Sequence, residues 1–154
     1  MPDGMISASQ MIYASRMQVR TGSVDSNYFC AEGRNMAENK LVDLSFEFAV
    51  AVVNLVDGIT SSGSAYMVDQ LARAGTSIGA NIHEAQYAHS RKDFVAKLEI
   101  ALKESNETSY WLKLLYATHR IDEPAYRSAE HLCSTIRRLL IASCKTAKDG
   151  SQNN

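Results

Sequence analysis

Apolar residues recur every three or four positions along most of the chain from Met36 onward, which is the spacing of an amphipathic α-helix. Glycine, serine, aspartate and proline interrupt this pattern at three places. We therefore expect helices over residues 39–57, 65–89, 90–119 and 122–148. Short links between long helices favour antiparallel neighbours, so the pattern predicts an all-α protein with an up-down-up-down four-helix bundle.

Each expected helix has one apolar stripe that should face the core. The stripes are Leu41, Leu44, Phe48, Ala51 and Leu55 in the first helix, Met67, Leu71, Ala74, Ile78 and Ala85 in the second, Phe94, Leu98, Ala101, Ser105, Thr108, Leu112 and Leu115 in the third, and Tyr126, Ala129, Cys133, Ile136 and Leu140 in the fourth. Ser90 and Asp93 have the spacing of a capping box at the start of the third helix. Asp122 followed by Pro124 is typical of the start of the fourth.

The second helix contains two glycines in its interior, Gly75 and Gly79. Each costs about 1 kcal/mol relative to alanine in a helix. Together with Ala72 they form a flat strip of small residues, which favours close approach of a neighbouring backbone. The alternative is that the glycines are weak points that the helix tolerates.

The two ends of the chain lack the helical period. Residues 1–35 contain Pro2, several glycines and many serines, so we expect a mostly disordered extension. Residues 149–154 are polar and should form a flexible tail. The predicted folded domain therefore covers residues 36–148.

The composition limits the cellular compartments and the classes of partner that we expect for this protein. The 16 Lys and Arg against 17 Asp and Glu give a net charge of −1, so no global field attracts nucleic acid or anionic lipid. Cysteines are odd in number, at Cys30, Cys133 and Cys144, and we expect reduced thiols. Because no continuous apolar segment is present, we expect a cytoplasmic protein with no membrane partner.

The first and third helices carry apolar residues beyond their core stripes. These are Val42, Phe46, Val53 and Val56 in the first helix, and Val95, Ile100, Leu102, Trp111 and Leu114 in the third. Such a surplus indicates a homo-oligomeric interface. The alternative is a wide core face, which many globular helices have.

The polar residues of the second and third helices do not form a recognisable catalytic or metal site. In an antiparallel hairpin, Arg73 falls opposite Glu104 or Glu107 and Glu84 falls near Lys97, which predicts ion pairs that fix the register. Bundle metal sites use Glu-x-x-His, which this chain lacks. Residues 75–79 lack the lysine of a phosphate loop, and no nucleophile elbow is present. We expect neither enzymatic activity nor a metal or cofactor.

Three stretches in order resemble a known family: Leu71-Ala-Arg-Ala-Gly-Thr-Ser-Ile-Gly-Ala-Asn-Ile-His-Glu-Ala-Gln86, Lys92-Asp-Phe94, and Lys103-Glu-Ser-Asn-Glu-Thr-Ser-Tyr-Trp-Leu112. The chain is similar there to the four-helix bundle proteins encoded by intervening sequences of bacterial 23S ribosomal RNA genes. The resemblance runs from near Met36 to about Lys148. It implies a homopentamer of poorly defined function, labelled as associated with 23S rRNA or as a ribosomal protein.

A related branch of this family is the accessory protein of diversity-generating retroelements, which works with a reverse transcriptase and binds nucleic acid. That activity is the alternative function that the resemblance implies. This chain is less basic than that branch, because residues 36–154 hold 13 Lys and Arg against 14 Asp and Glu. His83 also replaces the basic residue that commonly precedes the glutamate of the family's Asn-x-x-Glu motif. Residues 1–35 fall outside the resemblance, which makes Met36 a candidate start of the protein.

The resemblance carries over polar positions but no catalytic residue. The positions are Arg73, Ser77, Asn81, Glu84, Lys103, Glu104 and Glu107. If the protein contacts nucleic acid, the local basic clusters Arg91-Lys92 and Arg137-Arg138 are the expected contacts.

Overall fold

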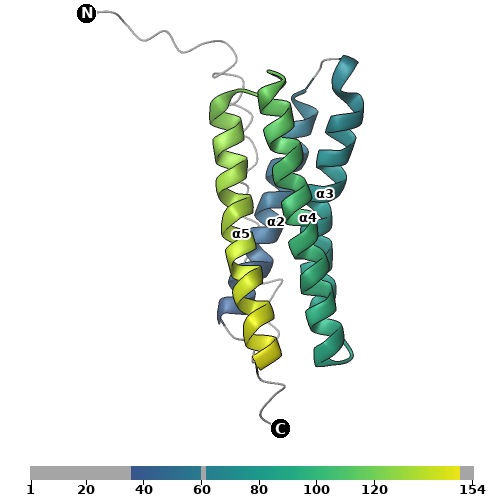
Figure 1. Ribbon diagram of the computed structural model, residues 1–154, viewed down its shortest axis with the longest axis vertical. Helices are drawn as coiled ribbons and strands as arrows, with labels where there is room; N and C mark the ends of the chain where they lie inside the picture. The colour runs from purple at the N-terminus through teal and green to yellow at the C-terminus, as the bar shows by residue number, and fades with distance from the viewer. Residues whose placement is uncertain (1–35, 60–61, 150–154) are drawn as a thin grey trace, which may run out of the picture. The chain divides into compact units, whose positions relative to one another are not determined.

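The computed structural model describes residues 36–59 and 62–149, which form four long helices (Figure 1). The helices are α2 (Met36–Asp57), α3 (Ala65–Ala85), α4 (Arg91–Ala117) and α5 (Glu123–Asp149), and a short 3₁₀ turn, η2 (Ser62–Ser64), precedes α3. The predicted all-α, antiparallel four-helix bundle is confirmed. The predictions for residues 1–35 and for the tail beyond Asp149 concern parts of the chain outside the described residues.

Each helix packs against two neighbours. The contacts between α3 and α4 are the most extensive, those of α4 with α5 and of α2 with α3 follow, and α2 touches α5 least. The helices therefore stand at four corners in the order α2, α3, α4 and α5, and the α2–α5 side is the least tightly packed.

The predicted starts of α4 and α5 are confirmed by their capping hydrogen bonds, whereas α2 begins three residues before the expected position. The backbone N–H of Asp93 donates to Ser90 Oγ (3.1 Å), while Asp93 Oδ2 accepts from the N–H of His89 (3.2 Å). At α5, the N–H of Ala125 donates to Asp122 Oδ1 (2.9 Å). These side chains satisfy N–H groups that have no partner within the first turn of a helix.

The helix ends differ from the expected ones by a few residues. α3 ends at Ala85, because the N–H groups of Gln86, Tyr87 and Ala88 bond to carbonyls three residues earlier and tighten the last turn. α4 ends at Ala117. His119 then has a φ of 56°, and the N–H of Arg120 bonds to Leu115 O (2.8 Å). This is a Schellman motif with histidine at the left-handed position that glycine usually occupies.

The core follows the predicted stripes, with buried hydroxyl side chains of the helices among the apolar ones. Ser45, Ser105 and Thr108 are buried, and each donates its hydroxyl proton to a carbonyl of its own helix at 2.7–2.8 Å. Because these protons have partners, the hydroxyls can lie in the core at low cost. In α2 the register differs slightly from the expected one, since Val52 is fully buried while Ala51 is half-buried.

Gly75 and Gly79 allow α2 and α3 to approach closely. A Cβ atom added to Gly75 would lie 2.9 Å from both Cγ1 and Cγ2 of Val52, and one added to Gly79 would lie 3.3 Å from the carbonyl oxygen of Ser45. The predicted close approach of a neighbouring helix is therefore confirmed, and that neighbour is α2. A methyl group at either position would have to displace α2.

The surplus apolar residues divide into two groups. Val42, Val56, Leu102 and Trp111 are among those that pack against the edge of the core, as the wide-face alternative required. Others are exposed to solvent: the exposed fractions are 68% for Phe46, 43% for Val53 and 40% for Ile100. Val50, which the sequence analysis did not single out, is 45% exposed beside them.

Replacing Gly75 with alanine should destabilise the bundle. The clash with Val52 should exceed the gain in helix propensity, and we expect the free energy of unfolding to fall by about 1–2 kcal/mol. Urea denaturation followed by circular dichroism measures it. In a Val52→Ala background the same substitution should cost little or should stabilise. Equal losses in both backgrounds would show that the contact between α2 and α3 is not tight.

Candidate functional site

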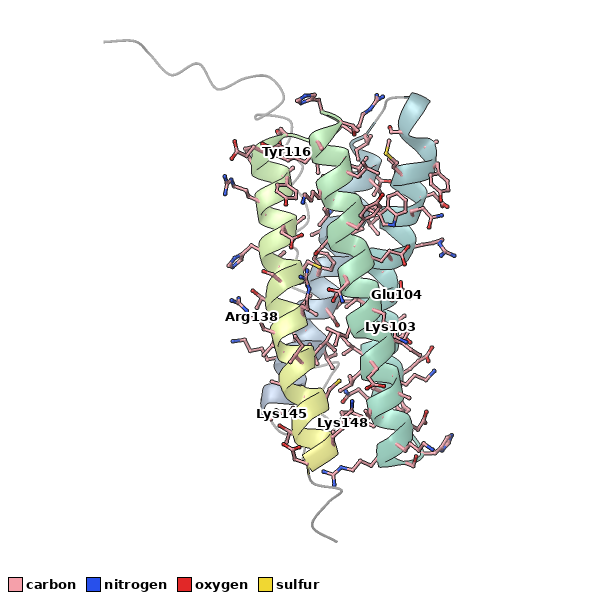
Figure 2. The ribbon with its side chains drawn as sticks, viewed as in Figure 1. Lys103, Glu104, Tyr116, Arg138, Lys145 and Lys148 are labelled. Carbon is pink, nitrogen blue, oxygen red and sulfur yellow. The ribbon has the colours of Figure 1, made fainter. Side chains whose placement is uncertain are left out.

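The polar positions carried over by the resemblance lie on α3 and α4. Arg73, Ser77, Asn81 and Glu84 follow one another at intervals of three or four on α3, so they share one side of that helix. Lys103, Glu104 and Glu107 lie on α4, where Figure 2 labels the first two. The structure thus brings the two sets to neighbouring helices without joining them all in one cluster.

Glu84 forms the ion pair with Lys97 that the antiparallel register predicts. Lys97 Nζ lies 2.5 Å from Glu84 Oε2, and the pKa of Lys97 is raised by its hydrogen bond to this carboxylate and by the negative charge. The side chains are 33% exposed for Lys97 and 58% exposed for Glu84, so the pair fixes the register of the α3–α4 hairpin more than it adds stability.

The second predicted ion pair does not form: Arg73 makes no ion pair with Glu104 or Glu107. The pKa of Glu104 is raised because burial and the charge of Glu107 outweigh the opposite effect of Arg73. Glu107 instead accepts a hydrogen bond from Trp111 Nε1 (3.1 Å). The half-buried Glu104 and the exposed Glu107 therefore carry more negative charge than their one arginine balances.

The remaining polar positions bond locally or point to solvent. Asn81 Nδ2 donates to the carbonyl of Ser77 (2.8 Å) and to its hydroxyl (3.3 Å), so this pair is satisfied within α3. Lys103 is exposed, and its charge contributes to lowering the pKa of Glu99. The larger cause is Lys148, which binds Glu99 from α5 at 2.6 Å.

A polar cluster between α4 and α5 escaped the sequence analysis. It consists of Ser105, Ser109, Glu130, Cys133 and Arg137. Arg137 Nη2 donates to the hydroxyl of Ser109 and lies 3.4 Å from Glu130 Oε1, and Ser109 donates to the same carboxylate oxygen (3.1 Å). The thiol of Cys133 donates to the carbonyl of Ser105 (3.3 Å). We call these five residues the α4–α5 cluster.

The α4–α5 cluster is suited to holding two helices together rather than to chemistry. Burial raises the pKa of the Cys133 thiol, although hydrogen bonds from Ser109 and Arg137 oppose the effect. A thiol with a raised pKa is a poor nucleophile at neutral pH. Glu130 Oε2 and Arg137 Nε are inaccessible and have no hydrogen-bond partner among the described residues. The one sequence signal for the cluster was the spacing of Glu130, Cys133 and Arg137 at three and four.

The four expected nucleic-acid contacts are separated. Arg91 and Lys92 are exposed in the first turn of α4. Arg137 lies in the α4–α5 cluster with about a quarter of its side chain exposed. Arg138 is exposed on the outer side of α5 and donates to Thr135 Oγ1 (3.1 Å). Consecutive helical residues point about 100° apart, which is why these two arginines do not act together.

The described part of the chain offers neither a metal-ligating cluster nor a membrane-spanning helix. Within residues 36–59 and 62–149, no three histidine, cysteine, aspartate or glutamate side chains gather where they could hold a metal ion. None of the helices in this part of the chain combines the length and apolar character needed to cross a membrane.

Replacing Arg137 with methionine should destabilise the bundle by about 1–3 kcal/mol, because Glu130 would keep its charge without its cationic partner. Urea denaturation measures the loss. The double variant Glu130→Met/Arg137→Met should recover most of it. Arg127→Met is the control, since Arg127 pairs with Glu123 at the surface and its loss should leave the free energy of unfolding nearly unchanged. Additive losses in the double variant would contradict this account.

Replacing Glu104 with glutamine should stabilise the protein at pH 7. A raised pKa means that the folded state disfavours the charged carboxylate, so its cost is present above the folded pKa and disappears as the pH falls below the unfolded pKa. The gain should therefore vanish near pH 3.5. Denaturation midpoints at both pH values measure it, with the exposed Asp69→Asn as control. A gain of the same size at both pH values would rule out ionisation as its cause.

Comparison with known proteins agrees with this architecture. A family model described as 23S rRNA-intervening sequence protein matches residues 37–142. No curated protein matches the chain. A solved structure of a protein of unknown function from the S23 ribosomal protein family, from Bacteroides thetaiotaomicron, is 48% identical, with a TM-score of 0.68. The match covers 71% of this chain and 99% of that one. Since the family model spans well over half of the sequence, the chain belongs to the 23S rRNA-intervening sequence protein family.

Proposed function

We propose that this chain is a non-enzymatic subunit of a homopentamer that associates with 23S rRNA in the cytoplasm. The observation that carries the proposal is the row of exposed apolar side chains on α2. Membership of the family supports the rRNA association, and the number of five copies comes from the resemblance.

Self-association would remove this row from water. Phe46, Val50 and Val53 lie at intervals of four and three, so they form one outward stripe on α2. Each is between 43% and 68% exposed in a single subunit. Burial of apolar surface contributes about 25 cal/mol per Å², and homo-oligomers bury such patches in symmetric contacts.

Contact with RNA would use basic side chains at one end of the bundle. Arg91 and Lys92 open α4, and α5 ends at the same end of the bundle (Figure 1). Figure 2 places Lys145 and Lys148 there on α5. Ammonium and guanidinium groups bind phosphates without reading sequence, and binding then depends steeply on salt.

The absence of catalysis is inferred from the chemistry of the candidate residues. Cys133 and Cys144 are buried, and burial raises the pKa of both thiols. The ion pair of Glu84 with Lys97 joins α3 to α4, and Glu130 is engaged by Arg137 of its own helix and by Ser109 of α4. The name of the matched family specifies no reaction.

RNA binding can be measured by fluorescence anisotropy at low salt with a labelled fragment of 23S rRNA. We expect binding that weakens as salt rises, and the double variant Arg91→Glu/Lys92→Glu should bind at least about tenfold more weakly. Lys113→Glu, an exposed change elsewhere on α4, is the control. Absence of binding at low salt, or equal loss in the control, would contradict the proposal. Equal binding of DNA and RNA would favour the alternative role beside a reverse transcriptase.

The number of copies is measured separately by light scattering. A mass of five subunits supports the pentamer. A chain that stays monomeric at high concentration would contradict self-association regardless of the RNA result.

A further inference from the structure

We infer that the outward side of α2 in one copy docks on the outward side of α5 in a second copy. This inference rests on the proposed self-association and names its surfaces. The α2 face consists of Asp43, Phe46, Glu47, Val50 and Val53. The α5 face consists of Arg138, Ile141 and Lys145.

The α2 face combines an apolar stripe with unpaired carboxylates. Its three large apolar side chains are exposed, and Phe46 is the most exposed of them at 68%. Asp43 and Glu47 are exposed beside them. Neither carboxylate forms an ion pair with another described residue. A partner for this face must therefore supply both apolar surface and positive charge.

The α5 face has the complementary composition. Ile141 is 52% exposed, and it lies three residues after Arg138 and four before Lys145, so the three side chains share one side of the helix. Lys145 forms no ion pair with a described residue, and Arg138 bonds only to the hydroxyl of Thr135. Figure 2 labels both on α5.

The charges of the two helices favour this pairing over contacts between like helices. α2 contains the acids Glu38, Asp43, Glu47 and Asp57 against the single base Lys40. α5 contains the bases Arg127, Arg137, Arg138, Lys145 and Lys148 against the acids Glu123, Glu130 and Asp149. Contact between two α2 faces would bring carboxylates together, and like charges across an interface are costly. Contact between α2 and α5 brings opposite charges together.

The two faces also lie at matching heights along the bundle. Three contacts show which residues of neighbouring helices lie at the same height along the bundle axis. Gly79 packs beside Ser45, Tyr66 contacts Trp111, and Ser105 contacts Cys133. When these heights are followed from α2 through α3 and α4 to α5, Phe46 lies at about the height of Ile141, Asp43 at that of Lys145 and Glu47 at that of Arg138. Copies related by a rotation about an axis along the bundle keep these heights. The three pairs would then meet at once.

Such a contact is heterologous, because each copy uses its α2 face once and its α5 face once. Heterologous contacts produce a closed ring when the rotation closes. The contact is thus compatible with an odd number of copies, unlike an assembly built only from two-fold interfaces. Arg138 and Lys145 would serve the subunit contact, which leaves Arg91, Lys92 and Lys148 as the proposed RNA contacts.

A charge exchange tests the pairing. Glu47→Arg alone and Arg138→Glu alone should each weaken the assembly, with a dissociation constant raised at least about tenfold. The double variant Glu47→Arg/Arg138→Glu restores opposite charges and should reassemble to the wild-type mass. Light scattering and sedimentation over a range of concentrations measure all four proteins. A double variant that assembles no better than the singles would overturn the inference.

The apolar part has a matched control. Phe46 and Tyr87 are both 68% exposed, but Tyr87 lies in the turn that follows α3, outside both faces. Phe46→Ser should dissociate the assembly, whereas Tyr87→Ser should leave its mass unchanged. Circular dichroism checks that the helices persist in each variant.

The outcomes separate the two proposals. A wild-type protein that is monomeric at all concentrations contradicts the proposed self-association itself. A wild-type oligomer whose mass is unaffected by Phe46→Ser and Glu47→Arg leaves self-association standing and overturns the α2–α5 contact. In that case the exposed aromatic side chains Tyr66 and Tyr110, beside Trp111, are the next surface to vary.

Discussion

The close contact between α2 and α3 is the constraint on which the rest of the bundle depends. Val52 and the backbone at Ser45 occupy the space that Gly75 and Gly79 leave open. This contact fixes the rotation of α2, and therefore which of its residues enter the core and which remain outside. Phe48 is buried and Phe46 is exposed because of that rotation. The composition of the outer surface of α2 thus depends on Gly75 and Gly79 of α3, which pack against the opposite side of α2.

Most of the fold could be predicted because its signals are local. Each signal is visible within a few residues of sequence: the capping residues Ser90 and Asp122, the periodic stripes, and the glycine pair Gly75 and Gly79. The burial of Val52 in place of Ala51 was not predictable in the same way, since both positions fit a helical period. Only the packing of α3 decides between them. The end of α3 was also missed, because Gln86–Ala88 could continue a helix and instead form a tighter turn.

The polar sites were harder to predict because they depend on how neighbouring helices are rotated. The pair of Glu84 with Lys97 followed from the short α3–α4 turn, which fixes the register nearby. Farther from the turn, Arg73 does not reach Glu104 closely enough for an ion pair. To predict the α4–α5 cluster, one would have to know which side of α5 faces α4. Arg137 looked like one half of a basic pair with Arg138, but its side chain lies against Ser109 and Glu130.

The buried thiols of α5 have a consequence for how motion in this protein can be observed. Cys133 and Cys144 lie one above the other on the inner side of the helix, and both are shielded from solvent. A thiol reagent can reach either one only when part of α5 separates from the bundle. The rate of modification at each position therefore reports local opening of that stretch of helix. The two cysteines thus probe two positions along the inner side of α5. The ratio of their modification rates would show from which end α5 detaches.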